Sequence, residues 1–432
     1  MRLKVGLKGK ARRTSSLSRL QGRKVGVPAN YQRHPKRCQC FTGERLLMWN
    51  KPRNLNHCCN ILDLRDLARR RLPHPIFEYL DGSAETETTA QRNISAFDEV
   101  SLIPRCLIDA TSVRTSTRIL GQDLAWPVFC GPTGASRFYH PDGELAVARA
   151  AAESGTLYSL STMSTHSLED VAAASSGPKM FQLYVFKDRD ITRELIERCK
   201  QSGYKALCLT VDCVVRGNRE RDFRTGFGSP PRLSANMIGS FIRRPGWFLG
   251  QAQKGWLSLA NLTQRAGTNS IVAHSKFVAE QTDPSVVWKD VREISDLWGG
   301  PLALKGILSA DDARRAVDFG ATAVIVSNHG GRQLDGVAAS IEVLPEIARA
   351  VGDQVDVIHD GGIRRGVHVL KALALGAKAC SIGRPYLYGL SAGGEAGVMK
   401  ALDILRTELI RAMQLSGCTE VANIDESMVR RF

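Results

Sequence analysis

The spacing of eight short apolar runs is the feature that most constrains the fold of this chain. The runs cover residues 127–131, 157–161, 180–184, 206–211, 302–305, 323–327, 355–358 and 379–383. Helix signals lie between them: Ser167 and Ser309 each precede an acidic residue by three positions, so that a hydroxyl can cap the first turn. Strands that alternate with helices predict a parallel sheet. Eight repeats predict a closed (β/α)8 barrel, the TIM barrel of the α/β class.

One gap between two of these runs is much longer than the others. Asp212, after the fourth run, and Lys305, at the end of the fifth, are 93 positions apart. Residues 223–279, inside this gap, hold seven basic residues and no acidic one. We therefore expect a long basic insert, at about residues 223–279, between strands 4 and 5 of the barrel.

The positive charge of the chain is concentrated at its beginning. The formal net charge is +16, and residues 1–60 alone hold 15 Lys and Arg against one acidic residue, Glu44. Because residues 1–56 also lack apolar periodicity, we expect a basic, disordered N-terminal extension followed by one domain over residues 57–432. An organelle transit peptide, or a start codon assigned too far upstream, would have the same composition. The extension contains no recognisable nucleic-acid-binding module, so we expect no nucleic-acid partner.

The remaining composition excludes several classes of protein. Apolar residues make up 43% and charged residues 24% of the chain, as in soluble globular proteins. No uncharged run reaches the roughly 18 apolar residues that a membrane-spanning helix needs. An integral membrane protein, a coiled coil and a largely disordered chain are therefore excluded.

The eleven cysteines predict neither a disulfide framework nor a metal site. Cys38 and Cys40 form a C-x-C pair, and Cys58 and Cys59 are adjacent beside His57, but zinc sites usually have C-x₂-C spacing. An odd number of scattered thiols favours a reducing compartment. Three thiols in or beside the apolar runs are expected to be buried: Cys208, Cys213 and Cys380.

Polar residues stand at the carboxyl end of all eight runs. In a (β/α)8 barrel the active site is built at these ends, so these residues are the first functional candidates. They include Thr133, Ser161, Gln182, Tyr184, Thr210, Asp212, Lys305, Ser327, His329, Asp360 and Arg384. A polar residue after one strand is often only a cap or a turn former, but eight strand ends out of eight indicate a shared site.

The last two strand ends carry a phosphate-binding pattern. Residues 359–366 read HDGGIRRG, and residues 381–385 read SIGRP. Paired glycines let backbone N–H groups approach an anion, and Arg364 and Arg384 can bind phosphate oxygens. Since the chain has no G-x-G-x-x-G or G-x₄-G-K-[ST] sequence, we expect the phosphate of a flavin or of a sugar.

The sixth strand end carries a candidate acid–base group. Residues 327–335 read SNHGGRQLD, in which His329 offers a proton acceptor and Arg332 a carboxylate clamp. Asp212 at the fourth strand end would orient the histidine, and Arg219 would add a second guanidinium. This set would serve an acid substrate that loses a C–H or an O–H proton.

Five segments together resemble one enzyme family. They are SNHGGRQLD at 327–335, DGGIRRG at 360–366, FQLYVFKD at 181–188, LTVD at 209–212 and LKG at 304–306. Through these segments, taken in their order along the chain, the protein is similar to the FMN-dependent α-hydroxy-acid dehydrogenases, which include glycolate oxidase, flavocytochrome b2, L-lactate dehydrogenase and mandelate dehydrogenase. The resemblance extends from about Ile61 to Cys418.

The resemblance implies roles for the strand-end residues. His329 would be the active-site base, assisted by Asp212, and Lys305 would lie beside the flavin, where a cation stabilises the reduced ring. The implied catalytic and substrate-binding residues are Tyr79, Tyr184, Asp212, Arg219, Lys305, His329 and Arg332. The implied FMN contacts are Pro132, Thr133, Gly134, Ser161, Gln182, Thr210, Lys305, Ser327, Asp360, Gly361, Gly362, Arg364, Gly383 and Arg384. Removal of the α-proton and removal of the hydroxyl proton by the histidine both stay open.

Two features of the sequence narrow the choice among the activities found in this family. Gly134 stands where the oxidases tend to have Ala, which resembles the dehydrogenases that react poorly with oxygen. Residues 237–262 mix large apolar side chains with cations, a combination that suits an anionic membrane surface. These side chains include Arg243, Arg244, Trp247, Phe248, Lys254 and Trp256. Family members that pass electrons to the respiratory chain have a similar insert, and the alternative is a basic lid over the active site.

The resemblance therefore implies an FMN enzyme that oxidises an (S)-2-hydroxy acid, first of all L-lactate to pyruvate. Electrons would pass to a membrane quinone or a cytochrome. Mandelate dehydrogenase is the nearest alternative, and a glycolate or other 2-hydroxy-acid oxidase that uses oxygen is the third. We expect a homotetramer on the cytoplasmic face of a bacterial inner membrane or, alternatively, in a mitochondrion. An inactive barrel with a nucleic-acid-binding arm is the competing hypothesis from another class.

Overall fold

Eight parallel strands form a closed barrel in the computed structural model, which describes residues 52–227, 234–255 and 257–431. The strands are β4 (Val128–Cys130), β5 (Tyr158–Ser161), β6 (Lys179–Leu183), β7 (Ala206–Thr210), β8 (Leu302–Ile307), β9 (Ala323–Val326), β10 (Asp356–Asp360) and β11 (Ala379–Ile382). β11 pairs with β4 and completes the ring. The predicted α/β barrel and all eight predicted strands are confirmed.

Burial on both faces explains why these strands appear in the sequence as continuous apolar runs. Every residue of β4, β5, β6, β7, β9 and β11 is buried, since one face points into the barrel and the other packs against helices. β7 and β8 pair directly, Leu209 with Leu304 and Thr210 with Lys305, although residues 211–301 separate them. The insert thus leaves the barrel unbroken.

A hairpin closes the amino end of the barrel. β2 (Thr117–Ile119) and β3 (Gln122–Leu124) pair in antiparallel fashion, and their apolar residues share a buried cluster with strand residues such as Phe129. The backbone N–H of Leu120 donates a hydrogen bond to Asp356 at the start of β10. With the amino end filled, a ligand has to enter from the carboxyl ends of the strands.

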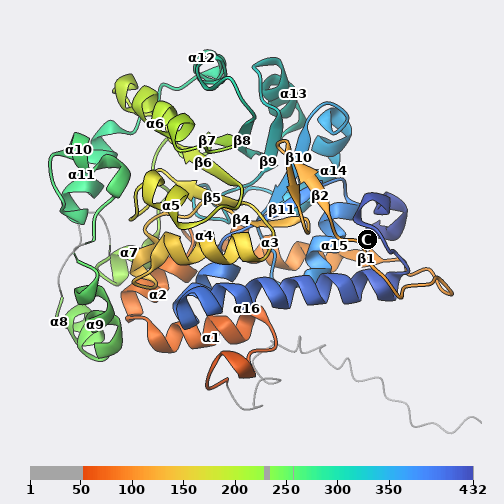
Figure 1. The fold of residues 1–432 in the computed structure, drawn as a ribbon, viewed down its shortest axis with the longest axis horizontal. Helices are drawn as coiled ribbons and strands as arrows, with labels where there is room; N and C mark the ends of the chain where they lie inside the picture. The colour runs from red at the N-terminus through yellow and green to blue at the C-terminus, as the bar shows by residue number, and fades with distance from the viewer. Residues whose placement is uncertain (1–51, 228–233, 256, 432) are drawn as a thin grey trace, which may run out of the picture. The chain divides into compact units, whose positions relative to one another are not determined.

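A helix follows each strand and covers the outside of the barrel (Figure 1). The helices are α4 (Gly143–Glu153), α5 (Leu168–Ala174), α6 (Arg189–Gln201), α12 (Trp288–Trp298), α13 (Ala310–Asp318), α14 (Ser340–Val351), α15 (Gly366–Ala374) and α16 (Arg384–Ser416). The helix starts predicted from Ser167 and Ser309 are confirmed, since each side chain accepts a hydrogen bond from the N–H three residues on. α16 bends at Gly393 and Gly394, where the backbone leaves the helical conformation.

Three helices precede the barrel, and α1 lies along α16 (Figure 1). They are α1 (Ile61–Arg71), α2 (His74–Asp81) and α3 (Thr88–Ser95). Arg65 of α1 donates two hydrogen bonds to Asp81 at the end of α2, at 2.6 and 2.7 Å. Tyr388 of α16 donates to the same carboxylate at 2.7 Å. This contact holds α2, which carries Tyr79, against the barrel. Shorter elements are η1 (Leu55–His57), η2 (Ala96–Glu99), β1 (Val100–Leu102), η3 (Ser136–Phe138), η5 (Val421–Asn423), η6 (Glu426–Met428) and β12 (Val429–Arg431).

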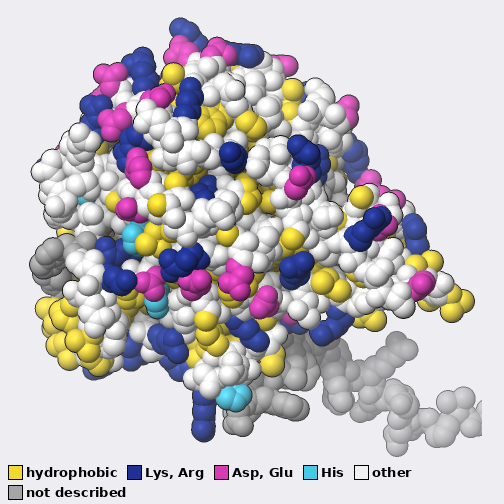
Figure 2. Space-filling view, in the orientation of Figure 1, with side chains coloured by type: hydrophobic (Ala, Val, Ile, Leu, Met, Phe, Trp, Pro, Cys, Tyr) yellow, Lys and Arg dark blue, Asp and Glu magenta, His cyan; other side chains and the backbone are white. Residues whose placement is uncertain are grey.

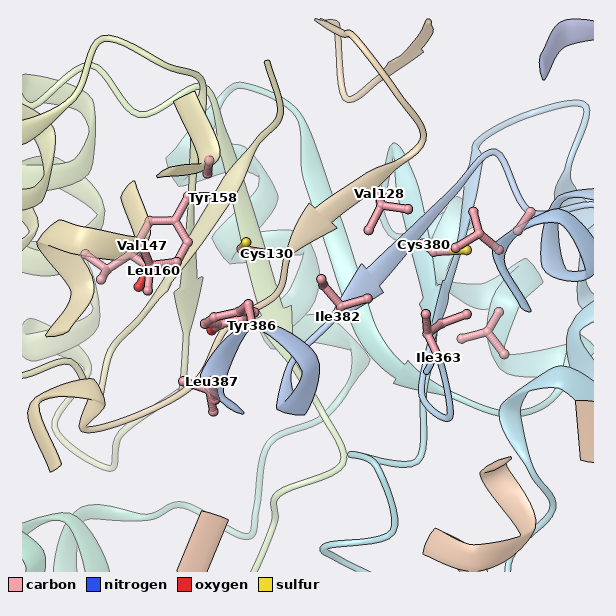
Figure 3. Close-up of a cluster of buried hydrophobic side chains, with 14 of the residues drawn as sticks. Val128, Cys130, Val147, Tyr158, Leu160, Ile363, Cys380, Ile382, Tyr386 and Leu387 are labelled. Atoms are coloured by element: carbon pink, nitrogen blue, oxygen red, sulfur yellow. The ribbon is translucent and has the colours of Figure 1, made fainter. Parts of the chain in front are cut away.

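A buried cluster joins the strands to the first turn of α16. In Figure 3, Cys130 of β4 and Ile382 of β11 lie close to Tyr386 of α16. The Tyr386 hydroxyl donates to the Gly131 carbonyl at 2.8 Å and lies 2.7 Å from the Thr133 hydroxyl. The first turn of α16 is thereby fixed to the segment that leaves β4.

The insert predicted between strands 4 and 5 of the barrel is confirmed, and it is mainly helical. Between β7 and α12 the chain forms α7 (Glu220–Arg224), α8 (Ala235–Ile242), α9 (Pro245–Gln253), η4 (Ala260–Leu262), α10 (Thr263–Ala266) and α11 (Ile271–Gln281). α8 and α9 contact each other and appear at the lower left of Figure 1. Trp256 lies outside the described residues. Among the described residues no helix, in the insert or elsewhere, is long and apolar enough to span a membrane.

The predicted extension, residues 1–56, falls mostly outside the described part of the chain. Cys38 and Cys40 lie outside it as well. Leu55 and Asn56 belong to η1, and the next cysteine, Cys58, is buried.

The nine cysteines of the described residues are free thiols. Cys208 and Cys380 are buried, as expected. The same expectation was wrong for Cys213, which is only half-buried because it lies just beyond the end of β7 and not within the strand.

Candidate active site

A cavity of about 1300 Å³ opens at the carboxyl ends of the strands. Its lining includes Tyr79, Pro132, Thr133, Gly134, Ser161, Tyr184, Thr210, Arg219, Lys305, His329, Arg332, Asp360, Gly361, Gly362, Arg364, Gly383 and Arg384. The three other predicted site residues, Gln182, Asp212 and Ser327, hydrogen-bond to lining residues. The structure therefore brings together every residue that the sequence assigned to the site.

His329 and Asp212 form a half-buried pair between the ends of β9 and β7. His329 Nδ1 lies 3.0 Å from Asp212 Oδ1, and the two side chains are 21% and 13% exposed. Burial lowers the pKa of His329, but the neighbouring Cys213 and Asp212 raise it by more than burial lowers it. The pKa is therefore above its ordinary value, at about 9. Burial raises the pKa of Asp212, but His329 and Lys305 lower it to about 2. Each partner thus stabilises the charged form of the other.

Lys305 places a fixed positive charge on the cavity wall. Its Nζ lies 2.9 Å from Ser327 Oγ and 3.1 Å from Asp360 Oδ2, and Ser327 Oγ donates to the same carboxylate at 2.7 Å. Burial lowers the pKa of Lys305, but Asp360 and Asp212 raise it well above its usual range. The ammonium group is therefore charged at any physiological pH.

Two arginines face the cavity beside the histidine. Arg332 Nη1 donates to the carbonyls of Tyr79 at 3.0 Å and Gly82 at 2.7 Å, and its guanidinium lies 5.3 Å from the centre of the Tyr79 ring. Burial and the nearby Arg219 lower the pKa of Arg332 to about 10. Within the described residues neither arginine forms an ion pair with a carboxylate. Two cations without an ion-pair partner on a cavity wall indicate an anionic ligand.

The ends of β10 and β11 form a backbone cradle beside the start of α16. Gly361 and Gly362 have φ values of +122° and +73°. A Cβ on Gly362 would lie 1.8 Å from the Asn93 carbonyl oxygen, so no other residue fits there. Arg384 begins α16 and donates to the Gly82 carbonyl and to Ser83 Oγ, at 2.8 and 2.6 Å. Backbone N–H groups and a helix start in this arrangement suit a phosphate.

Three buried polar atoms around the cavity test whether a flavin fits. Within the described residues, Gln182 Nε2, Thr210 Oγ1 and Arg384 Nε have no hydrogen-bond partner. A buried polar atom without a partner costs about 1–3 kcal/mol, so native structures rarely keep one unless a ligand satisfies it. Gln182 and Thr210 stand on β6 and β7, and Arg384 stands at the cradle. The residues thus fit a ligand with a polar ring system at one end and a phosphate at the other, as in flavin mononucleotide.

Taken together, these features define an α/β-barrel enzyme that holds a phosphate-bearing cofactor next to a site for a carboxylate substrate. Known proteins agree with this description. Residues 68–431 match the model of the family described as FMN-dependent dehydrogenase. An L-lactate oxidase of Nostoc sp. is 44% identical over 379 residues, which cover 86% of this chain and 97% of that protein. An L-lactate dehydrogenase of Caulobacter vibrioides is 42% identical over 369 residues, or 85% and 96% of the two chains.

Solved structures show the same relationship. The crystal structure of the monotopic membrane protein (S)-mandelate dehydrogenase superposes with a TM-score of 0.84 at 37% identity, covering 87% of this chain and 100% of the other. The chain belongs to the FMN-dependent dehydrogenase family. Its cofactor is FMN, and its reaction is the flavin-dependent oxidation of a 2-hydroxy acid.

One residue of the cavity wall and one buried carboxylate elsewhere were not recognised from the sequence. Cys213 lines the cavity, and its Sγ lies 3.4 Å from His329 Nδ1. Its position directly after the strand-end residue Asp212 was the available signal. Glu144 is fully buried and accepts hydrogen bonds from the N–H groups of Ser136 and Thr165, both at 2.9 Å. Acidic residues are common in the first turn of surface helices, so nothing in the sequence marked Glu144 as buried.

The segment predicted to contact the membrane, residues 237–262, is only partly exposed to solvent. Leu259 and Leu262 are buried in the main core. Trp247 Nε1 donates to the Phe138 carbonyl at 2.7 Å, and Arg137 donates to the carbonyl of Lys254 at 2.9 Å. The end of the segment packs into the core and part of α9 is bonded to the segment that follows β4, and attachment of residues 237–262 to a membrane stays a prediction.

Proposed function

We propose that this protein is an (S)-2-hydroxy-acid dehydrogenase that oxidises L-lactate to pyruvate and passes the electrons to a membrane quinone or a cytochrome. The observation that carries the proposal is the cavity wall on which the His329–Asp212 pair stands beside Arg219 and Arg332, two cations without a carboxylate partner among the described residues. A 2-hydroxy acid offers both a carboxylate and a proton that must leave.

Each of these side chains has a task in the proposed reaction. Arg219 and Arg332 bind the substrate carboxylate, and the hydroxyls of Tyr79 and Tyr184 hydrogen-bond its oxygens. Because Nδ1 of His329 faces Asp212, Nε2 is the nitrogen left to accept the substrate proton. Asp212 is a positioning residue that stabilises the imidazolium so formed, in keeping with the raised pKa of His329.

The cofactor residues divide into two groups. FMN, when bound, accepts the two electrons of the oxidation. Gln182 and Thr210, whose polar atoms have no partner among the described residues, would hold its ring, and Lys305 would supply a positive charge to it. At the other end the two glycines after β10, the start of α16, and Arg364 and Arg384 bind the phosphate. The complete set of proposed site residues consists of the cavity-lining residues named above together with Gln182, Asp212 and Ser327, which hydrogen-bond to them.

A second candidate substrate is (S)-mandelate, and an aromatic wall of the cavity favours it. The ring of Tyr79 lies 5.1 Å from that of Phe227 and 6.5 Å from that of Phe138, and the two phenylalanine rings are 5.2 Å apart. All three residues line the cavity. An aromatic substrate side chain would pack against this wall, whereas the methyl group of lactate would leave much of it uncovered.

The surface of α8 and α9 supports attachment to an anionic membrane. Ile242 is 73% exposed, Phe248 61% and Leu249 60%, and Arg243 is exposed beside them. Figure 2 shows hydrophobic side chains gathered at the lower left, over α8 and α9. Such a surface suits peripheral binding to a membrane that holds the electron acceptor. The cytoplasmic face of a bacterial inner membrane is the proposed location, and the homotetramer stays a prediction.

Gly134 supports a dehydrogenase over an oxidase. A Cβ at this position would lie 3.0 Å from Met163 Cβ, so the alanine expected of the oxidases would need this neighbour to shift. Gly134 therefore matches the local packing.

Anaerobic titration of the purified holoenzyme with each hydroxy acid tests the proposal. We expect the flavin absorbance to bleach with L-lactate and not with D-lactate, and air to restore it slowly, so that hydrogen peroxide forms at the same slow rate. Bleaching by (S)-mandelate at a much lower concentration than by L-lactate would replace the first candidate by the second. Rapid peroxide release would identify an oxidase, and no bleaching by any (S)-2-hydroxy acid would refute the proposal.

A further inference from the structure

A sulfur atom lies next to the proposed acid–base pair, and no role assigned above uses it. Cys213 Sγ is 3.4 Å from His329 Nδ1 and 3.4 Å from Asp212 Oδ1. One side-chain nitrogen, oxygen and sulfur atom of these three residues lie within 4.8 Å of one another. Cys213 lines the cavity and is half-buried, so the cluster can be reached from solvent.

The three donor atoms are spaced like one face of a zinc coordination tetrahedron. With Zn–S bonds of about 2.3 Å and Zn–N and Zn–O bonds of about 2.0–2.2 Å, tetrahedral ligand atoms lie about 3.4–3.6 Å apart. The observed separations are 3.4, 3.4 and 3.0 Å. Side-chain shifts of about a few tenths of an ångström would therefore admit the ion, and water from the cavity would complete the fourth position.

The chemistry of the donors selects the class of cation. A thiolate, an imidazole and a carboxylate form a set that Zn²⁺ prefers, whereas Mg²⁺ and Ca²⁺ take oxygen ligands. Asp212 Oδ2 is buried and has no hydrogen-bond partner among the described residues, so it is available to the ion or to its water. The Lys305 ammonium opposes a second cation nearby, but its ion pair with Asp360 offsets that charge.

We propose that Asp212, Cys213 and His329 form a binding site for one Zn²⁺ ion per chain. On binding, bonds form from the metal to the sulfur, nitrogen and oxygen atoms, and the protons carried by the thiol and the imidazole pass to solvent. The ion takes Nδ1 of His329 away from Asp212 and adds positive charge to the ring. If His329 is the base of the proposed function, bound Zn²⁺ inhibits turnover reversibly while FMN stays in place.

Equilibrium dialysis of the holoenzyme against Zn²⁺ alone tests the site without relying on activity. Wild type should bind one ion per chain more than Cys213→Ala, and Cys106→Ala, which alters an exposed cysteine, should match wild type. His329→Ala should lose the same ion. Loss of a direct ligand should weaken this binding by about 100-fold or more, since even residues behind the ligands change affinity by about 10–100-fold. Equal binding by wild type and Cys213→Ala would overturn the proposal.

Inhibition is measured separately, relative to the activity of each variant without zinc. In wild type and Cys106→Ala a chelator should restore activity and FMN should remain bound, whereas Cys213→Ala should need about 100-fold more Zn²⁺ for the same inhibition. Release of FMN in step with inhibition would place the ion elsewhere and overturn the proposal. Binding that depends on Cys213 without inhibition would support the site and refute His329 as the base, so failure of the proposed function can be told apart.

Discussion

The carboxyl end of the barrel and the α8–α9 pair depart from the usual distribution of side chains in opposite ways. At the barrel, charged groups such as Lys305 and Arg332 are held inside a cavity, and several polar atoms there have no partner among the described residues. On α8 and α9, large apolar groups such as Ile242 and Phe248 stand in solvent. Folding alone explains neither arrangement, because each costs stability until something binds. The cavity at the barrel end fits an anionic ligand. The exposed apolar groups of α8 and α9 support the proposed attachment to a membrane.

The two regions also touch each other. Trp247 of α9 donates to the Phe138 carbonyl, and Gln251 donates to the Arg137 carbonyl. Both acceptors belong to η3, which follows β4, and Phe138 also lines the cavity. Substitutions can therefore show whether catalysis at the barrel end and membrane binding by α8 and α9 are lost independently of each other.

Replacing His329 should give the largest effect and should be confined to the barrel. General-base catalysis contributes about 10²–10⁴-fold, so His329→Ala should lower kcat by about 10³-fold. FMN content and vesicle binding should not change. The control is His74→Ala, since that imidazole is 63% exposed on α2. Turnover of His329→Ala within about tenfold of wild type would remove it as the base.

Replacing the apolar surface should affect only the membrane. Serine at Ile242, Phe248 and Leu249 together removes three exposed apolar groups, each worth about 1 kcal/mol at partial burial in lipid. Binding to vesicles that contain anionic lipid should fall by about 100-fold, because each 1.4 kcal/mol corresponds to a factor of ten.

The triple variant should keep the wild-type activity when a soluble dye is the electron acceptor. Serine at Leu107, Ile108 and Leu415, which are also exposed, is the matched control and should bind vesicles like wild type. Vesicle binding that survives the loss of Ile242, Phe248 and Leu249 would show that the anchor lies elsewhere.

The same comparison explains how much the sequence could predict. Strands buried on both faces leave continuous apolar runs, and the barrel rule gathers the residues that follow them, so the cavity and its lining were predictable. The insert obeys no such rule. Leu262 and Phe248 look alike in the sequence, yet one is buried in the core and the other is exposed, because contacts with distant segments decide which side each faces. Glu144 and Cys213 were missed for the same reason: their neighbours are remote in the chain or depend on where a strand ends.

The pH profile should sharpen the assignment of the barrel end. A base must be neutral to accept a proton, and the pKa of His329 in the free enzyme is about 9. kcat/KM should therefore rise about tenfold per pH unit from about pH 6 and level off near pH 9. Asp212→Asn should move this limb to lower pH, because burial then lowers the pKa of the imidazole with less opposition. A profile that is flat over this range in wild type would show that His329 is already neutral.

The smallest expected effect lies where the two regions meet. Trp247→Phe keeps an aromatic ring against Phe241 but removes the donor to the Phe138 carbonyl, a loss of about 1 kcal/mol or about 2 °C in Tm. Trp298→Phe removes a comparable bond, from Trp298 Nε1 to the Pro301 carbonyl at 2.9 Å, at the end of α12. Both variants should lose similar stability. Only Trp247→Phe should raise the substrate KM, by about twofold to fivefold, because Phe138 packs edge to face on Tyr79 in the cavity wall. Equal KM values in the two variants would mean that α9 lies against the active site without positioning it.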